Sequence, residues 1–229
     1  MPGILYAVPT PLGGTAAAAL PAPALATLRT LREFVVENAK TARAFLKEVD
    51  MPCPLQELNI VTITSDVSPS IKQLQEGTSI GLLSEAGCPS IADPGAALVE
   101  AAQDAGIRTV PLIGPSSIVL ALMASGLEGQ RFAFCGYLPR EPQERKKKIR
   151  ELEARSRRAR ETQIFIETPY RNDVLLGSLI EALSGKTRLC VATDLTAATE
   201  SVRTRSVEAW RNKKQTIGKR PTVFLLLSG

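Results

Sequence analysis

The chain has 229 residues, 44% of them hydrophobic and 22% charged, a balance typical of a globular protein and not of a disordered one. It contains no histidine, which excludes Ser-His-Asp and Cys-His catalysis and nearly all catalytic zinc sites, so a general base must be Asp, Glu, Lys, Tyr or a held water. The four cysteines form no CxxC pair, so we expect no metal site and a cytoplasmic protein whose thiols are reduced. No segment has the roughly 18 continuous apolar residues of a membrane span, so we expect no membrane partner.

Patterns typical of strands and of helices alternate along most of the chain. Strands are expected at 3–8, 33–36, 59–64, 79–83, 107–110, 131–135, 163–167, 188–192, 200–205 and 222–228, and helices at 24–31, 39–48, 68–76, 94–105, 116–124, 142–160, 172–183 and 206–212. This alternation predicts an α/β fold of two domains, residues 1–115 with a mainly parallel sheet and residues 116–229 with a mixed sheet. The four alanines at 16–19, with prolines close behind, are expected to form a flexible surface loop.

Two loops of small residues follow neighbouring predicted strands. The first has the sequence Ser-Glu-Ala-Gly-Cys-Pro-Ser-Ile-Ala-Asp-Pro-Gly at 84–95, and the second is Gly-Pro-Ser-Ser at 114–117. Such loops let backbone groups approach a ligand closely at the strand ends of an open α/β sheet, although an ordinary strand-to-helix turn is the alternative. Asp93 is expected to cap the next helix, with Pro94 as its first residue.

The net charge of +5 is concentrated in one segment. Residues 140–161 hold ten Lys or Arg and five Asp or Glu, and the rest of the chain is neutral. Ile149 and Leu152 are spaced as in an amphipathic helix, so we expect a basic helix that contacts nucleic acid, or else a solvated helix face. Aromatic residues are only 4% of the chain, which argues against RNA-binding modules built as base-stacking platforms.

Six motifs occur in an order that resembles a known family. They are Tyr-Ala-Val-Pro-Thr-Pro-Leu-Gly-Gly at 6–14, the loops at 84–95 and 114–117, Ser-Gly-Leu at 125–127, Gly-Tyr-Leu-Pro at 136–139 and Phe-Ile-Glu-Thr-Pro-Tyr-Arg at 165–171. Together they resemble the tetrapyrrole methylase superfamily of S-adenosylmethionine-dependent methyltransferases. Within it they are most similar to the bacterial enzymes that methylate a cytidine ribose 2′-hydroxyl of small-subunit ribosomal RNA.

The resemblance implies two α/β domains with a cofactor cleft between them, a homodimer, and a set of site residues. The cofactor S-adenosylmethionine would contact Ser84, Glu85, Ala86, Gly87, Pro89, Pro115, Ser116, Ser117, Tyr137 and Leu138. The first glycine-rich loop, with Pro9, Thr10 and Gly13, would face the substrate; it lacks the Gly-Lys-Ser/Thr end of a Walker phosphate loop.

The chain departs from the pattern of the ribosomal RNA enzymes at three places. Residues 37–40 are Glu-Asn-Ala-Lys, where those enzymes typically have Glu-Asp-Thr-Arg. Residues 193–197 are Thr-Asp-Leu-Thr-Ala, where they have Arg-Glu-Leu-Thr-Lys. Residues 218–221 are Gly-Lys-Arg-Pro, where they usually have a Gly-Glu pair. An Arg and a Lys that could touch RNA are therefore absent from their usual positions, and Lys40 is the nearest basic residue by motif.

Removal of a proton from a ribose hydroxyl needs a general base, and no histidine is available for it. The carboxylates expected beside the cleft are Glu37, Glu167, Asp194 and Glu200, and Lys40 is the nearest basic candidate. Glu37 and Glu167 both follow predicted strands and are the candidates, although Glu167 could instead pair with Arg171 or cap the next helix. Arg171 and the cluster Arg145, Lys146, Lys147 and Lys148 are expected to hold the RNA backbone. Two alternatives stay open: a non-catalytic RNA- or ribosome-binding module on the same fold, and methylation of a small tetrapyrrole-like substrate.

Overall fold

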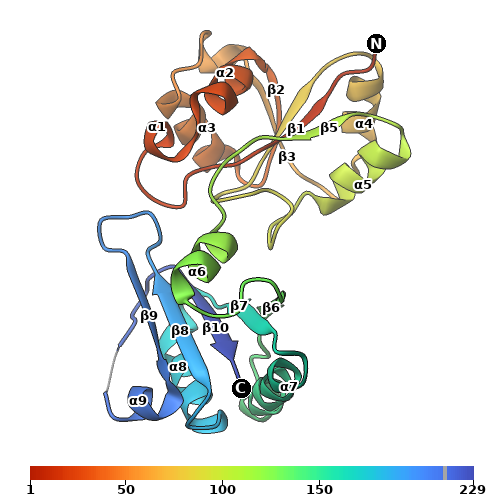
Figure 1. The fold of residues 1–229 in the computed structure, drawn as a ribbon. Helices are drawn as coiled ribbons and strands as arrows, with labels where there is room; N and C mark the ends of the chain where they lie inside the picture. Colours follow the sequence, from red (N-terminus) through yellow and green to blue (C-terminus); the bar gives the residue numbers. More distant parts are fainter. Residues whose placement is uncertain (214–215) are drawn as a thin grey trace. The chain divides into compact units, whose positions relative to one another are not determined.

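The computed structural model describes residues 1–213 and 216–229, which form two compact units, Met1–Ser116 and Ser117–Gly229 (Figure 1). Every predicted strand and helix has a counterpart in them, and the predicted α/β class, with a parallel first sheet and a mixed second sheet, is confirmed. In the described part of the chain, no helix is both long enough and apolar enough to cross a bilayer.

The first unit is a parallel five-stranded sheet in the order β3-β2-β4-β1-β5. Its strands are β1 (Leu5–Val8), β2 (Glu33–Val36), β3 (Asn59–Thr62), β4 (Ile80–Leu83) and β5 (Thr109–Pro111). One core joins the sheet to α1 (Ala16–Ala19), α2 (Ala22–Thr30) and α3 (Ala39–Glu48), with the short helix η1 (Leu55–Glu57) beside it; a second joins it to α4 (Ser68–Gln75) and α5 (Ala96–Asp104). Because helices cover both faces, the central strand β4 is apolar throughout and fully buried.

The second unit has a mixed sheet in the order β6-β7-β10-β8-β9. Its strands are β6 (Phe132–Tyr137), β7 (Thr162–Ile166), β8 (Arg188–Thr193), β9 (Ser201–Ser206) and β10 (Thr222–Leu227). Its helices are α6 (Ser117–Ser125), α7 (Pro142–Ala159), the short η2 (Pro169–Arg171), α8 (Asn172–Ala182) and α9 (Val207–Arg211). Helices α7, α8 and α9 share one core with the sheet, which includes the stacked rings of Phe165 and Phe224.

The expected basic helix is α7, and its ends are set by local chemistry. The Glu141 carboxylate accepts a hydrogen bond from the Glu144 amide, Pro142 occupies the first turn, and Arg160 ends the helix in the left-handed conformation. Ile149 and Leu152 are buried, as their spacing predicted.

Arg145 differs from the expectation that it faces RNA, because it is only 4% exposed. Its Nε donates to the Ser178 hydroxyl at 3.0 Å and its Nη1 donates to the Arg140 carbonyl at 2.7 Å. The guanidinium therefore fastens the start of α7 to α8 within the second unit, and it is not available to a phosphate.

Two local predictions are wrong. Residues 16–19 are the short helix α1, not a flexible loop: the Thr15 side chain caps it, and the Ala16 amide donates to the Glu48 carboxylate at 2.6 Å. Helix α5 begins at Ala96 with Gly95 as its N-cap, so Asp93 does not cap it. Gly95 has a φ of +127°, and an added Cβ there would lie 2.8 Å from the Ser90 hydroxyl.

The internal role of Arg145 makes a testable prediction. Arg145→Ala leaves the Arg140 carbonyl and the Ser178 hydroxyl without their donor, so the free energy of unfolding should fall by about 2–4 kcal/mol. The matched control is Arg150→Ala on the exposed face of the same helix, which should change stability by no more than about 0.5 kcal/mol. Urea unfolding measures both, and equal effects of the two substitutions would contradict the assignment.

Candidate functional site

In the first unit, the predicted site residues gather at the carboxyl edge of the parallel sheet. Strands β1 and β4 are neighbours in this sheet. After β1 the chain continues into α1 and α2 on one face of the sheet, whereas after β4 it continues into α5 on the opposite face. Such a switch point opens a crevice beyond the strand ends, where open α/β sheets bind ligands. The loops after β1, β2, β4 and β5 all end at this edge.

The loops after β1 and β4 are joined directly. Thr10 and Gly87 form an antiparallel bridge, with hydrogen bonds of 2.9 and 3.0 Å between their amides and carbonyls. The Thr10 hydroxyl also donates to the Ser84 carbonyl at 3.3 Å. The structure thus brings the predicted substrate-facing loop, with Pro9 and Gly13 on either side of Thr10, against the predicted cofactor loop.

The loop after β5 closes on the other two. A Cβ added at Gly114 would lie 2.4 Å from the Cβ of Pro9, so only glycine lets the two loops approach this closely. The Cys88 thiol donates to the Pro115 carbonyl at 3.3 Å. Pro115 therefore lies beside the loop at 84–95 with Ser116 next to it in the chain, whereas Ser117 begins α6 in the second unit.

Three carboxylates lie at the same edge of the first unit. The Glu37 Oε2 accepts the backbone amide of Glu85 at 3.0 Å, and the Glu85 Oε1 accepts the Thr41 hydroxyl at 3.3 Å. The pKa of Asp93 is raised to about 6, mainly because the side chain is partly buried and also because the Glu37 carboxylate is close. A hydrogen bond with Ser84 lowers this pKa, but by less than the other effects raise it. Among the described residues, no Lys or Arg forms an ion pair with Glu37, Glu85 or Asp93.

Asp93 is the residue of this edge that sequence reasoning missed as a site residue. Ser90 and Ala92 have φ values of +67° and +66°, which L-residues seldom adopt, and they turn the chain so that Asp93 interacts with Glu37 and not with the amides of α5. A carboxylate within a loop of small residues was the available signal. The Asp-Pro pair instead indicated a helix cap.

The predicted residues of the second unit gather at one edge of the mixed sheet. Strands β6 and β7 are parallel neighbours, so Tyr137 with Leu138 and Glu167 with Arg171 follow adjacent strand ends. The Leu138 side chain is buried in the core of this unit, which leaves its backbone as the part that could contact a cofactor. Tyr137 is exposed.

Glu167 is a buried carboxylate whose bonds are internal. Its Oε1 accepts the Thr168 amide at 2.8 Å, and its Oε2 lies 3.3 Å from the Arg171 guanidinium. The Glu167 side chain is only 1% exposed, so a substrate hydroxyl cannot reach it without a rearrangement. Of the three uses weighed for Glu167, as proton acceptor, as partner of Arg171 or as a helix cap, the geometry favours the ion pair with Arg171.

Two of the departures from the family pattern are joined by one ion pair. The Arg220 Nε donates to Asp194 Oδ2 at 2.6 Å, and its Nη2 donates to the Thr199 carbonyl. Asp194 and Thr196 have positive φ values, so this loop, like the loop at 84–95, is held in an uncommon backbone conformation. A guanidinium therefore does reach this edge, supplied by the loop before β10 and neutralised by Asp194.

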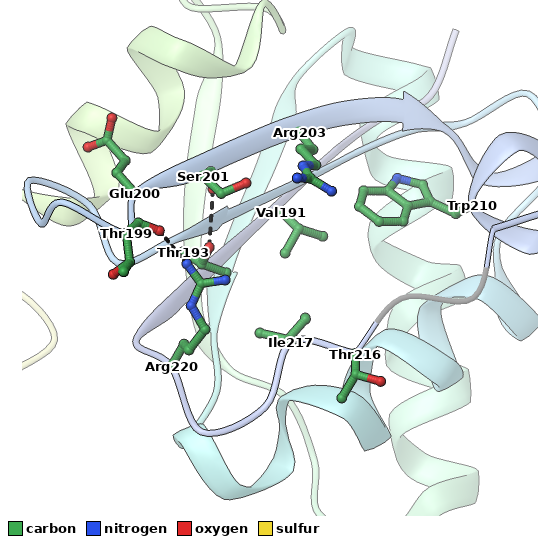
Figure 2. A pocket seen from close by; sticks show the side chains of 10 residues that line it. All are labelled: Val191, Thr193, Thr199, Glu200, Ser201, Arg203, Trp210, Thr216, Ile217 and Arg220. Atoms are coloured by element: carbon green, nitrogen blue, oxygen red, sulfur yellow. Dashed lines mark hydrogen bonds between the residues drawn. The ribbon is translucent and has the colours of Figure 1, made fainter.

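A pocket of about 450 Å³ lies beside this loop in the second unit (Figure 2). It is lined by Val191, Thr193, Thr199, Glu200, Ser201, Arg203, Trp210, Thr216, Ile217 and Arg220. Figure 2 shows Arg203 and Trp210 at one end of the pocket and Thr199 with Arg220 at the other. The mixture of an apolar floor with hydroxyls and guanidinium groups suits an organic ligand that carries polar groups.

The predicted basic residues are divided between the two units. Lys40, in the first turn of α3, is exposed at the loop edge of the first unit. On α7, Lys146 pairs with Glu181 at 2.7 Å, and Lys148 lies 3.8 Å from Glu151. Lys147 has no ion-pair partner among the described residues and is exposed.

Comparison with known proteins gives consistent relatives. The chain is 34% identical over 220 residues to "Ribosomal RNA small subunit methyltransferase I" of Bacillus subtilis, which covers 95% of this chain and 73% of that protein. It is 36% identical to the protein of the same name from Mesorhizobium japonicum, and the match covers 90% of this chain and 68% of that protein. It is 34% identical to the protein of that name from Vibrio cholerae, and the match covers 87% of this chain and 67% of that protein. No family model matches the sequence.

Solved structures share the fold at low identity. The methyltransferase CobJ gives a TM-score of 0.66 at 17% identity, over all of this chain and 95% of that one. Diphthine synthase gives a TM-score of 0.63 at 15% identity, over 98% of this chain and 89% of that one. The uroporphyrin-III-C-methyltransferase of Thermus thermophilus gives a TM-score of 0.56 at 20% identity, over 100% of this chain and 93% of that one.

The raised pKa of Asp93 makes stability depend on pH. Between about pH 4 and about pH 6 the folded chain keeps a proton that the unfolded chain has released, so the free energy of unfolding falls as the pH rises through that window. Asp93→Asn should remove this fall and stabilise the protein above about pH 6, by on the order of 1 kcal/mol after allowance for the partial exposure of the side chain.

Urea unfolding of both proteins across this pH range measures the effect. The difference in stability between Asp93→Asn and the unsubstituted protein should be smallest near pH 4 and reach its plateau above about pH 6. A difference that does not change with pH would contradict the raised pKa.

Proposed function

Because the chain belongs to the ribosomal RNA small subunit methyltransferase I family, we propose that it transfers a methyl group from S-adenosylmethionine to a ribose 2′-hydroxyl of small-subunit ribosomal RNA. The observation that carries the proposal is the identity of 34–36% to proteins of that name over most of the chain. The low-identity structural neighbours support the fold alone, so they do not favour a tetrapyrrole substrate.

The loop edge of the first unit fits S-adenosylmethionine by charge and by shape. When bound, this cofactor supplies a methyl group already activated by the positive charge of its sulfonium. Glu37, Glu85 and Asp93 present negative charge that no cation of the described residues offsets. Ala86 is exposed and small, so the backbone of this loop is open to a ligand there, whereas the amide and carbonyl of the buried Gly87 are already bonded to Thr10.

We assign the proton acceptor to Asp93, with Glu37 beside it. A general base works best when its pKa lies near the working pH, and Asp93, with a pKa of about 6, meets that condition. The Glu37 carboxylate holds the Glu85 amide and raises the pKa of Asp93, which makes Glu37 a positioning residue. Glu167 holds Arg171 in place for a phosphate of the substrate.

The exposed basic residues of α7 support contacts with the phosphate backbone of the RNA. Lys147 and Arg150 line a shallow groove of about 490 Å³ on this helix and form no ion pair among the described residues. They would add a salt-dependent attraction to phosphates, and Arg145 is no part of it.

We further propose that the protein acts in the cytoplasm as a homodimer. The resemblance to the superfamily supports the dimer, and the hydrophobic share of 44% permits an apolar interface between copies. A light-scattering mass near the 24.6 kDa of a single chain would contradict the dimer.

The test of the proposed function is methyl transfer from labelled S-adenosylmethionine to small ribosomal subunits. The unsubstituted protein should transfer label, and the cofactor at 100 times its dissociation constant should stabilise the fold by about 2.7 kcal/mol. Asp93→Asn should lower the transfer rate by roughly 10²–10⁴-fold, the usual contribution of a general base. The rate of the unsubstituted protein should fall below about pH 6, where Asp93 becomes protonated.

Two controls separate the roles in this assay. Glu167→Gln should weaken RNA binding through Arg171 without changing the pH profile, whereas Asp93→Asn should abolish the pH dependence. Cofactor stabilisation without transfer to any ribosomal RNA would favour the non-catalytic binding module. No cofactor binding at all would contradict the methyltransferase proposal.

A further inference from the structure

Tyr170 is an unusually exposed aromatic side chain at the carboxyl edge of the second sheet. The residue is 77% exposed, although it lies only a few residues after strand β7. The Lys219 ammonium lies 5.2 Å from the ring centroid, over the face of the ring. An aromatic face beside a cation is the combination that proteins use for a nucleobase and its phosphate.

The Tyr170–Lys219 pair is held by a buried network. The Asn172 side chain, fully buried, donates to the carbonyls of Gly218 and Arg220 at 3.2 and 2.7 Å. The Asp173 carboxylate accepts the amides of Ile217 and Gly218. These bonds fix the loop that carries Lys219 against the turn that carries Tyr170, so the pair is set before any ligand arrives.

The charges nearby leave Lys219 available to an anion. Arg171 and Arg220 each have a carboxylate partner, Glu167 at 3.3 Å and Asp194 at 2.6 Å. Among the described residues, no carboxylate lies within ion-pair distance of Lys219. Its remaining interaction is with the ring itself, which leaves its ammonium able to bind a phosphate.

We propose that Tyr170 and Lys219 form a site for one unpaired nucleotide of the substrate RNA, whose base stacks on Tyr170 and whose phosphate binds Lys219. The inference rests on the proposed function for its choice of RNA. Paired bases are already stacked on their neighbours, so the site selects single-stranded RNA. S-adenosylmethionine also carries a base and an anionic group, its carboxylate, so the test measures the affinities for RNA and for the cofactor separately.

The test is the affinity of the full chain for a short fluorescein-labelled single-stranded RNA, measured by anisotropy. Tyr170→Ala should weaken binding by roughly 5- to 150-fold, which corresponds to one lost stacking contact of about 1–3 kcal/mol, and Tyr170→Phe should retain the affinity. Lys219→Gln should reduce the slope of log affinity against log salt by about 0.7, the value for one phosphate contact in a single strand. The same strand in a duplex should bind equally to the unsubstituted protein and to Tyr170→Ala.

The matched control is Phe132→Ala, because Phe132 is also an exposed aromatic residue of the second unit. It lies at the amino end of β6, whereas Tyr170 lies beyond the carboxyl end of the neighbouring parallel strand β7. Phe132→Ala should leave RNA affinity unchanged. Equal affinities of Tyr170→Ala and the unsubstituted protein for the single strand would overturn the site, even if methyl transfer is intact. A loss confined to S-adenosylmethionine affinity would also overturn it and assign the ring to the cofactor.

Failure of the proposed function gives a different result. If the unsubstituted protein transfers no methyl group but Tyr170→Ala still weakens single-strand binding, the nucleotide site stands and the enzymatic proposal does not.

Discussion

The bridge between Thr10 and Gly87 is the contact on which the candidate site of the first unit depends. Strands β1 and β4 are neighbours whose chains leave toward opposite faces, so their loops would separate unless they were joined. Two backbone hydrogen bonds join them, and they require the φ of +83° that Gly87 adopts at low cost. With Gly87 fixed, the Glu85 amide reaches the Glu37 carboxylate, and the loop after β5 packs where only Gly114 fits. One bridge thus sets the positions of four loops.

That arrangement has an energetic cost, which is informative about function. Asp93 is partly buried beside two further carboxylates without a compensating cation among the described residues, and Ser90 and Ala92 adopt strained backbone conformations close by. A structural loop would relieve such repulsion with a single basic side chain. A loop that must receive a positively charged ligand gains affinity from the same repulsion, because the ligand removes it on binding. The unrelieved negative charge of the first unit is therefore what supports our proposal that this edge receives a cationic cofactor.

Much of this fold was predictable from the sequence, because it follows from local patterns. The strands and helices could be assigned from apolar periodicity, and the site loops from their runs of small residues after strands. What failed depends on contacts between distant residues. The alanines at 16–19 form a helix because Glu48 accepts the Ala16 amide, and Arg145 is buried because Ser178 and the Arg140 carbonyl surround its guanidinium. A charge pattern alone cannot separate such an arginine from an exposed one.

The departures from the family pattern become connected once the second unit is seen in three dimensions. The loop at 194–200 and the loop at 217–221 lie about 20 residues apart in the sequence, yet the Asp194–Arg220 ion pair joins them. The second loop is also fastened to α8 by Asn172 and Asp173. Because the loop is held at both ends of this short span, Lys219 between them is fixed over Tyr170. The bonds that hold these two loops together therefore also hold the Lys219 cation at the edge where we propose that the substrate binds.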